Sequence, residues 1–200
     1  MIRAVVFDFG HVLSSGEGIY CEPARLLGVE PEAVEALYWR DRRAYDEGGS
    51  DRDYWAPILE GLGKPVAPET IRQLALLDAA VWTATVRPQA LQIVQDVRAA
   101  GRLVAIVSNA PAVMDAAFFE APYAEDADYW FVSAAMGITK PNPAVYERVT
   151  EVLEVEPSEI AFVDDRQPNV DAADAFGWVA HTWVSDADTR AWLVDLGVLS

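Results

Sequence analysis

Short apolar runs, each closed by a polar residue, recur along this chain. The first run extends from Ile2 to Phe7, with Arg3 as its one charged residue, and ends at Asp8. A near-continuous apolar strand is typical of a parallel sheet that is covered on both faces. Later runs of the same character are Leu103–Val107, Tyr129–Val132, Ile160–Val163 and Val179–Val184. The pattern therefore predicts a sheet of buried parallel strands.

Helical patterns separate these strands from residue 88 onward. The predicted helices are Pro88–Ala100, Ala112–Phe119, Asn142–Leu153, Pro168–Phe176 and a short helix after Ser185. Glycines follow two of these patterns, as they commonly do at helix ends. Strands that alternate with helices indicate the α/β fold class, with a doubly wound parallel sheet and right-handed crossovers.

The stretch between the first two strands is helical and contains no convincing strand. Its helical patterns cover Glu22–Leu27, Pro31–Asp46, the segment from Asp51 to Gly61 and a helix after Pro68. Such an insertion divides the chain into two domains. We expect residues 1–14 and 86–200 to form the α/β core, and residues 15–85 to form a small helical cap domain.

Acidic residues outnumber basic ones by 32 to 15, which gives a formal net charge of −17. Such a surface repels nucleic acid and anionic membranes, so we exclude both as general partners. An anionic substrate would need a local concentration of positive charge. Cys21 is the single cysteine, so the chain forms no internal disulfide. Without a long apolar run or a basic leader, we expect a cytoplasmic protein that is a monomer or homodimer.

Polar residues follow three of the predicted strands at the point where each strand ends. These residues are Asp8, Ser108-Asn109 and Asp164-Asp165. In a parallel sheet the carboxyl ends of the strands lie along one edge, where α/β proteins bind their ligands. A lysine, Lys140, precedes a predicted helix at the same edge. We therefore expect all of these side chains to meet in one site.

This set of side chains suits phosphoryl transfer. Clustered carboxylates repel one another unless a cation lies between them, and hard oxygen ligands select magnesium. Magnesium and Lys140 would neutralise a phosphate dianion, and donors at the head of a helix would bind its oxygens. Asp8 would then attack phosphorus and form an aspartyl-phosphate, which water hydrolyses.

Four short motifs give the chain a resemblance to the haloacid dehalogenase (HAD) superfamily of hydrolases along essentially its whole length. The motifs are Phe7-Asp8-Phe9-Gly10-His11-Val12-Leu13, Val107-Ser108-Asn109, Lys140-Pro141-Asn142-Pro143-Ala144-Val145-Tyr146 and Phe162-Val163-Asp164-Asp165. The resemblance implies a Rossmann-like core, a small mobile helical cap of the C1 type, and Mg²⁺ as the cofactor.

The same resemblance implies a role for each motif residue. Asp8 would be the nucleophile and a metal ligand, together with the backbone carbonyl of Gly10 and the carboxylate of Asp165. Asp164 would belong to the catalytic set as an acid that supports the metal ligands. The remaining matches are the phosphate-binding residues Ser108 and Asn109 and the catalytic lysine, Lys140.

One position departs from the family pattern. Most phosphatases of the family have a second aspartate, the general acid, where Gly10 stands. The dehalogenases also lack that acid, but they work without metal and have neutral residues in place of Asp164-Asp165. A bacterial subgroup of sugar-phosphate phosphatases resembles this chain in its Asp-x-Gly opening. The retained acidic pair therefore favours a magnesium enzyme.

Three further residues are candidates for substrate contacts. His11 lies three positions past Asp8 and either faces the substrate or belongs to the hinge loop. Arg42 and Arg43 lie in a basic, aromatic segment of the cap and would reach the substrate when the cap closes. The alternative for Arg42 is a helical ion pair with Asp46, four residues on.

We therefore predict a magnesium-dependent phosphatase that acts on a small phosphorylated metabolite, such as a sugar phosphate, through an aspartyl-phosphate. The first alternative is a 2-haloacid dehalogenase, in which Asp8 attacks carbon. The second is a catalytically silent module that binds phosphorylated ligands.

Overall fold

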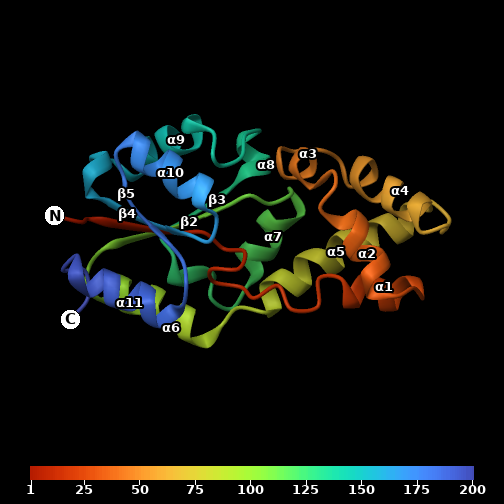
Figure 1. The fold of residues 1–200 in the computed structure, drawn as a ribbon, viewed down its shortest axis with the longest axis horizontal. Coiled ribbons are helices and arrows are strands. Elements are labelled where there is room, and N and C mark those ends of the chain that lie inside the picture. Colours follow the sequence, from red (N-terminus) through yellow and green to blue (C-terminus); the bar gives the residue numbers. More distant parts are fainter.

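A five-stranded parallel sheet forms the core of the computed structural model, which describes all 200 residues (Figure 1). The strands are β1 (Ala4–Phe7), β2 (Leu103–Ser108), β3 (Tyr129–Val132), β4 (Ile160–Asp164) and β5 (Val179–Thr182). Their order across the sheet is β3-β2-β1-β4-β5, so the first strand of the chain is the central one. The predicted α/β fold with a parallel sheet is confirmed.

Helices cover both faces of this sheet (Figure 1). On one face lie α6 (Pro88–Ala99) and α11 (Asp186–Asp195), and on the other lie α9 (Pro143–Leu153) and α10 (Gln167–Phe176). Successive residues of β1 point into the two separate hydrophobic clusters that these helices complete. All four β1 residues are at most 1% exposed. Burial on both faces explains why the strand is a continuous apolar run.

The strand register brings the ends of three strands to the same level. Phe7 lies beside Ile106 of β2 and Val163 of β4. The residue after Phe7 is therefore next to the last residue of β4, and it is level with the residue before the last one of β2. The polar residues that close these strands consequently meet at one edge of the sheet.

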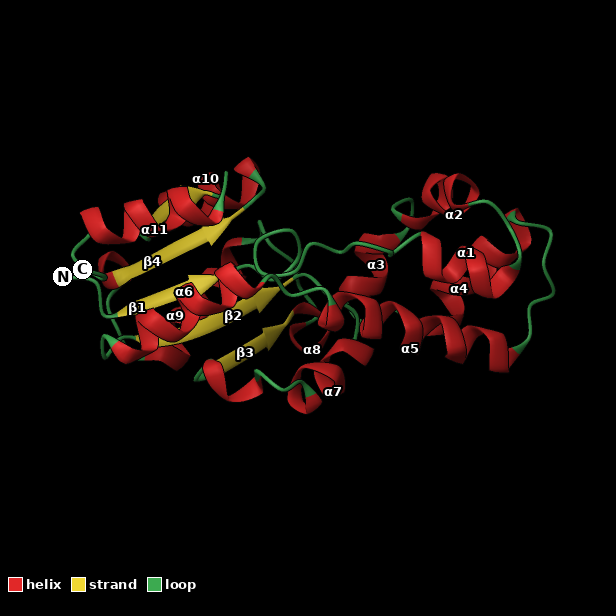
Figure 2. Ribbon diagram, turned by 90° about the horizontal axis from the view of Figure 1, so that it is seen from below, coloured by secondary structure: helices red, strands yellow, loops and turns green.

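A bundle of helices extends beyond that edge (Figure 2). Its members are α1 (Cys21–Leu27), α2 (Pro31–Tyr38), α3 (Arg42–Asp46), α4 (Asp51–Gly61) and α5 (Pro68–Ala84). Aromatic and aliphatic side chains fill its interior, among them Tyr38, Trp55 and Leu74, each of which is fully buried. Short helices of the core, α7 (Val113–Glu120) and α8 (Ser133–Met136), lie between this bundle and the sheet (Figure 2).

The chain breaks the predicted helix Pro31–Asp46 into two at residues 39–41. In a continuous helix the carbonyl of Tyr38 would accept the N–H of Arg42. Here that carbonyl accepts a hydrogen bond from the hydroxyl of Tyr54, at 2.6 Å. A contact between helices therefore replaces a contact within the helix, and α3 starts in a new direction.

Two chain segments connect the helical bundle to the core, and they are bonded to each other. Ser14 Oγ donates to the carbonyl of Trp82 at 2.7 Å, and the backbone N–H of Ser15 donates to the carbonyl of Thr85 at 2.9 Å. The backbone N–H of Arg87 also donates to the carbonyl of Leu13, at 2.9 Å.

No helix of the chain combines the length and the apolar character that crossing a membrane requires.

Candidate active site

Lys140 lies between two carboxylates at the carboxyl edge of the sheet. Its Nζ donates to Asp8 Oδ1 at 2.8 Å and to Asp164 Oδ2 at 2.6 Å. Asp8 is 8% exposed, Lys140 3% and Asp164 0%, so water screens these charges little. The structure thus brings together three residues that are 132 and 24 positions apart in the chain.

Three donor groups form hydrogen bonds to the carboxylate of Asp164. Besides Lys140, it accepts the backbone N–H of Arg166 at 2.9 Å and the amide of Asn169 at 2.9 and 3.0 Å. Four hydrogen bonds to one carboxylate fix its position. Asn169 was missed in the sequence, although a polar side chain five residues past a strand-end acid, in the first turn of the next helix, is a usable signal.

Asp8 and Asp165 are the less satisfied acids of the site. Burial raises the pKa of Asp8 to about 7 against the opposing effect of Lys140, and the charge of Asp164 raises it further. Burial, with Asp164, also raises the pKa of Asp165. Asp164 and Asp8 hold the pKa of Lys140 above its usual value although burial opposes its charge. The cluster of three acids and one lysine therefore has an excess of negative charge.

The three acids satisfy the first requirement of a metal site. Oxygens of Asp8, Asp164 and Asp165 all lie within 4.8 Å of one another. Carboxylate oxygens are the ligands that Mg²⁺ prefers, and one lysine cannot neutralise three carboxylates. Asp164 already accepts four hydrogen bonds from three donor groups, so Asp165 and Asp8 are the carboxylates with free oxygens. The donor set fits a divalent cation.

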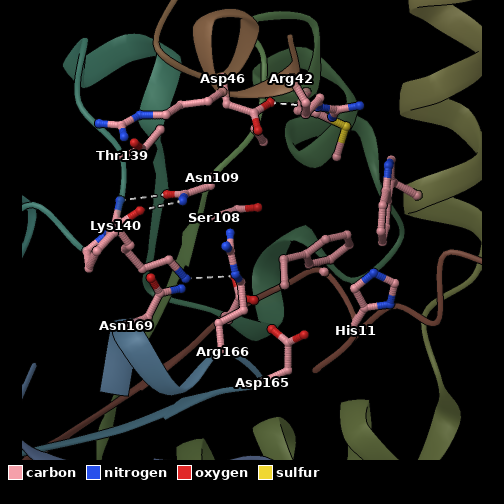
Figure 3. A pocket seen from close by; sticks show the side chains of 18 of the residues that line it. His11, Arg42, Asp46, Ser108, Asn109, Thr139, Lys140, Asp165, Arg166 and Asn169 are labelled. Atoms are coloured by element: carbon pink, nitrogen blue, oxygen red, sulfur yellow. Dashed lines mark hydrogen bonds and ion pairs between the residues drawn. The ribbon is translucent and has the colours of Figure 1, made fainter. Parts of the chain in front are cut away.

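Ser108 and Asn109 follow β2 into the same site, with different tasks. Ser108 lines the cavity, and its hydroxyl makes no hydrogen bond within the chain, so it is free to bind a ligand (Figure 3). The side-chain amide of Asn109 forms two hydrogen bonds with the backbone of Lys140. It donates to the Lys140 carbonyl at 2.9 Å and accepts the Lys140 N–H at 2.8 Å. Its amide therefore fixes the lysine loop.

Gly10 and His11 lie against an indole that the cap contributes. A Cβ at Gly10 would be 3.5 Å from the ring of Trp82, which is ordinary contact. The His11 ring meets the same indole edge-on at 5.3 Å, and its backbone is left-handed, with φ of 60°. Arg87 donates to the carbonyl of His11 at 3.1 Å and also to that of Val12. His11 lines the cavity, and its loop is held in place from both sides.

Arg42 also lines the cavity, but its guanidinium is engaged inside the cap (Figure 3). It donates to Asp46 Oδ1 at 2.8 Å and to Asp78 Oδ2 at 3.0 Å, and it contacts the hydroxyl of Tyr38. The side chains of Arg42 and Asp78 are 7% and 0% exposed. Of the two sequence interpretations, the pair with Asp46 is the one that the structure contains.

This buried network predicts a stability effect. We expect Arg42→Ala to lower the free energy of unfolding by about 3–5 kcal/mol, because two acids would stay buried without their cation. Arg40→Ala is the matched control, since that side chain is 50% exposed and pairs only with its neighbour Asp41; it should leave stability nearly unchanged. Urea denaturation of both variants measures the difference. Equal midpoints would show that the network does not hold the cap together.

A cavity of about 590 Å³ separates the sheet edge from the cap. The core supplies the acids and lysine described above, and the cap supplies Trp39, Arg42, Arg43, Asp46 and Trp82. Figure 3 shows the core side chains Ser108, Lys140, Asp165 and Arg166 on one side of this space and Asp46 and Arg42 on the other. Such a cavity has the size of a small-molecule site.

A parallel sheet with a strand-end aspartate, a lysine and an acidic pair under a helical insertion defines the class of HAD-like hydrolases. A family model described as haloacid dehalogenase-like hydrolase matches residues 2–177. The chain belongs to this family. It is a hydrolase with the α/β core of the family and an inserted helical cap.

Two groups of proteins are among those similar to the chain. (S)-2-haloacid dehalogenase 1 of Pseudomonas sp. (strain CBS-3) is 29% identical over 189 residues, which cover 88% of this chain and 82% of that protein. L-2-haloacid dehalogenase from Xanthobacter autotrophicus, with chloropropionic acid covalently bound, superposes with a TM-score of 0.73 at 24% identity, covering 100% of this chain and 85% of that one.

The second group is represented by a HAD family enzyme from Bacteroides thetaiotaomicron, whose structure is a complex with magnesium and inorganic phosphate. It superposes with a TM-score of 0.70 at 21% identity, covering 91% of this chain and 94% of that one. At these identities the structural likenesses establish the shared fold. The substrate has to be inferred from the side chains of the site.

Proposed function

We propose that the protein is a magnesium-dependent phosphatase that hydrolyses a small phosphorylated metabolite through an aspartyl-phosphate on Asp8. The observation that carries the proposal is the meeting of Asp8, Asp164 and Asp165, with oxygens within 4.8 Å of one another. Lys140 balances only one of these charges, so a divalent cation is needed for the rest. The motif resemblance implies that dehalogenases of this family typically have neutral residues in place of the last two acids.

We assign the metal to Asp8, Asp165 and the backbone carbonyl of Gly10. When bound, Mg²⁺ would neutralise the phosphate oxygens and favour the ionised form of Asp8. Lys140 and the free hydroxyl of Ser108 would bind the same phosphate group. Asn109 holds the backbone of Lys140, and Asp164 accepts a hydrogen bond from its Nζ. Both residues therefore fix the position of the lysine.

Two displacements at phosphorus complete the proposed reaction. A carboxylate oxygen of Asp8, which Lys140 holds through Oδ1, attacks phosphorus. The bond between phosphorus and the ester oxygen breaks, and that oxygen takes a proton from solvent. Water then forms a bond to phosphorus, the bond to Asp8 breaks, and inorganic phosphate leaves with the release of one proton.

Metal removal tests this proposal. We expect excess EDTA to abolish hydrolysis of phosphate esters and Mg²⁺ to restore it. Asp165→Asn should raise the Mg²⁺ concentration for half-maximal rate by about 10-fold or more, the scale expected when a metal site loses a supporting group. Asp171→Asn, on the exposed side of α10, is the control and should leave the requirement unchanged. Phosphatase activity that survives EDTA would contradict the proposal.

A second candidate, 2-haloacid dehalogenase, is favoured by the curated relative from Pseudomonas. In that reaction a carboxylate oxygen of Asp8 would displace the halide from carbon, and water would hydrolyse the resulting ester. Incubation with 2-chloropropionate in EDTA distinguishes the two. Release of chloride without metal, together with no hydrolysis of any phosphate ester, would establish the dehalogenase and exclude the phosphatase.

A further inference from the structure

The cavity has a different charge balance from the rest of the protein. Of the 15 lysines and arginines of the chain, four line it, whereas only three of the 32 aspartates and glutamates do. The basic residues are Arg42, Arg43, Lys140 and Arg166, and the acidic ones are Asp8, Asp46 and Asp165. A chain with a net charge of −17 thus concentrates cations at one place, which is the condition for attracting an anion.

Two of the four cations are neutralised by buried carboxylates. Arg42 pairs with Asp46 and Asp78, and Lys140 pairs with Asp8 and Asp164. Neither has charge to spare beyond what the buried acids and the transferring phosphate require. The remaining two, Arg166 and Arg43, lie on opposite components of the site, the core and the cap.

Arg166 combines a fixed backbone with a free side chain. Its N–H donates to Asp164 Oδ1 at 2.9 Å, and its carbonyl accepts the N–H groups of Asn169 and Val170 at 2.9 and 3.2 Å. Its guanidinium forms no ion pair or hydrogen bond within the chain. Figure 3 shows this side chain rising from the core into the cavity between Asp165 and Ser108. An unpartnered guanidinium on a fixed backbone is available to bind an anion.

Arg43 reaches the cavity from α3 of the cap. Its Nε donates to Glu47 Oε1 at 3.0 Å, while the side chain as a whole remains 79% exposed. Glu47 also accepts the hydroxyl of Thr139 at 2.8 Å, so this contact joins the cap to the residue before Lys140. The terminal nitrogens of Arg43 make no hydrogen bond within the chain and are available to a ligand.

Building on the phosphatase function above, we propose that Arg166 and Arg43 form a subsite for a second anionic group, carried by the leaving part of the substrate. The substrate is then a phosphate monoester that also bears a carboxylate or a second phosphate. Both groups present the planar or tripodal oxygens that a guanidinium binds through paired hydrogen bonds. A neutral sugar phosphate would leave the guanidinium of Arg166 and the terminal nitrogens of Arg43 without a partner in the ligand.

Three substrates that carry the same anomeric phosphate, with cleavage at C1 followed by the release of the C1-hydroxyl sugar, isolate this subsite. Glucose 1-phosphate, glucuronic acid 1-phosphate and glucose 1,6-bisphosphate differ only at C6, which is neutral, a carboxylate or a phosphate. We expect kcat/KM for one or both anionic sugars to exceed that for glucose 1-phosphate by about 10-fold or more, the ratio that one charge-assisted hydrogen bond supplies. Which of the two is preferred identifies the anionic group.

Variants then assign the preference to the two arginines. Arg166→Gln and Arg43→Gln should each reduce the preference for the C6 anion, through KM, by about 10-fold. Arg166→Lys keeps the charge without the paired donors and should retain part of the preference. Arg148→Gln, an exposed arginine of α9 outside the cavity, is the control and should change nothing. Circular dichroism checks that each variant is folded.

Two outcomes would overturn the subsite. One is equal kcat/KM for all three sugars in the wild type. The other is an equal loss on all three sugars and on p-nitrophenyl phosphate in Arg166→Gln, which would place Arg166 on the transferring phosphate. If no phosphate ester is hydrolysed, the proposed function fails, and calorimetry of the three sugars with Asp8→Asn in Mg²⁺ decides the subsite alone. Tighter binding of a C6 anion supports it, and equal affinities overturn it.

Discussion

Replacing Asp8 by asparagine should reduce turnover by about 10⁴-fold or more while the protein stays folded. Asparagine has nearly the same shape, and its carbonyl oxygen can still accept the hydrogen bond that Lys140 Nζ makes to Oδ1 at 2.8 Å. It cannot form the acyl-phosphate, so the first displacement at phosphorus is lost. Steady-state hydrolysis of p-nitrophenyl phosphate in saturating Mg²⁺ measures the effect.

The stability of Asp8→Asn separates a chemical effect from a structural one. Burial raises the pKa of Asp8 to about 7, which means that the metal-free fold disfavours the charged carboxylate. A neutral side chain removes that cost at every pH above the pKa, so the melting temperature at pH 8 should be unchanged or higher. More than a few per cent of the wild-type rate in the folded variant would show that Asp8 is not the nucleophile.

The sheet could be predicted from the sequence because its three central strands, β1, β2 and β4, are buried on both faces. Residues such as Val5 and Val6 point to opposite sides, yet both are 0% exposed, so the strand has no polar face to obscure the pattern. The predicted end of the last strand was wrong, since β5 stops at Thr182 and not at Val184. The apolar side chain of Val184 is 70% exposed, so hydrophobicity alone extended the prediction too far.

The members of the site could be predicted from their positions at strand ends, but their partners could not. Parallel strand register places Asp8 beside Asp164, and this follows from topology. The pairing of Arg42 with Asp78, 36 residues apart, depends on how α2, α3 and α5 pack. The break after Tyr38 has the same origin, because a hydroxyl 16 residues away takes its carbonyl. Helical spacing contains no information about such contacts.

The absence of an acid at position 10 sets the chemistry that the site can perform. Gly10 has no side chain, and the indole of Trp82 lies 3.5 Å from where its Cβ would be. His11 is the titratable side chain of the same loop that reaches the cavity, and its ring packs edge-on against that indole at 5.3 Å. A leaving oxygen therefore departs with little help from the loop that follows Asp8. General acids typically contribute about 10²–10⁴-fold to such steps, most when the leaving group is strongly basic.

Rates should accordingly depend steeply on the acidity of the leaving group. In a series of aryl and alkyl phosphates at saturating Mg²⁺, we expect kcat/KM to fall by about 10²-fold or more from nitrophenyl to simple alkyl esters. Sugar 1-phosphates and acyl phosphates, whose leaving oxygens are more acidic, should be better substrates than alkyl phosphates. The second displacement also lacks a base, so a burst of the first product should precede the steady state with aryl esters.

Gly10→Asp should flatten this dependence by supplying the missing acid. The backbone at Gly10 is not left-handed, and a Cβ there meets Trp82 at an ordinary distance, so the loop accepts the side chain. Gly10→Asn is the matched control, because it has the same shape but no carboxyl proton, and it should leave the slope steep. A flat slope in the wild type would contradict the prediction and show that another acid already serves. If His11→Ala then made that slope steep, the acid would be His11.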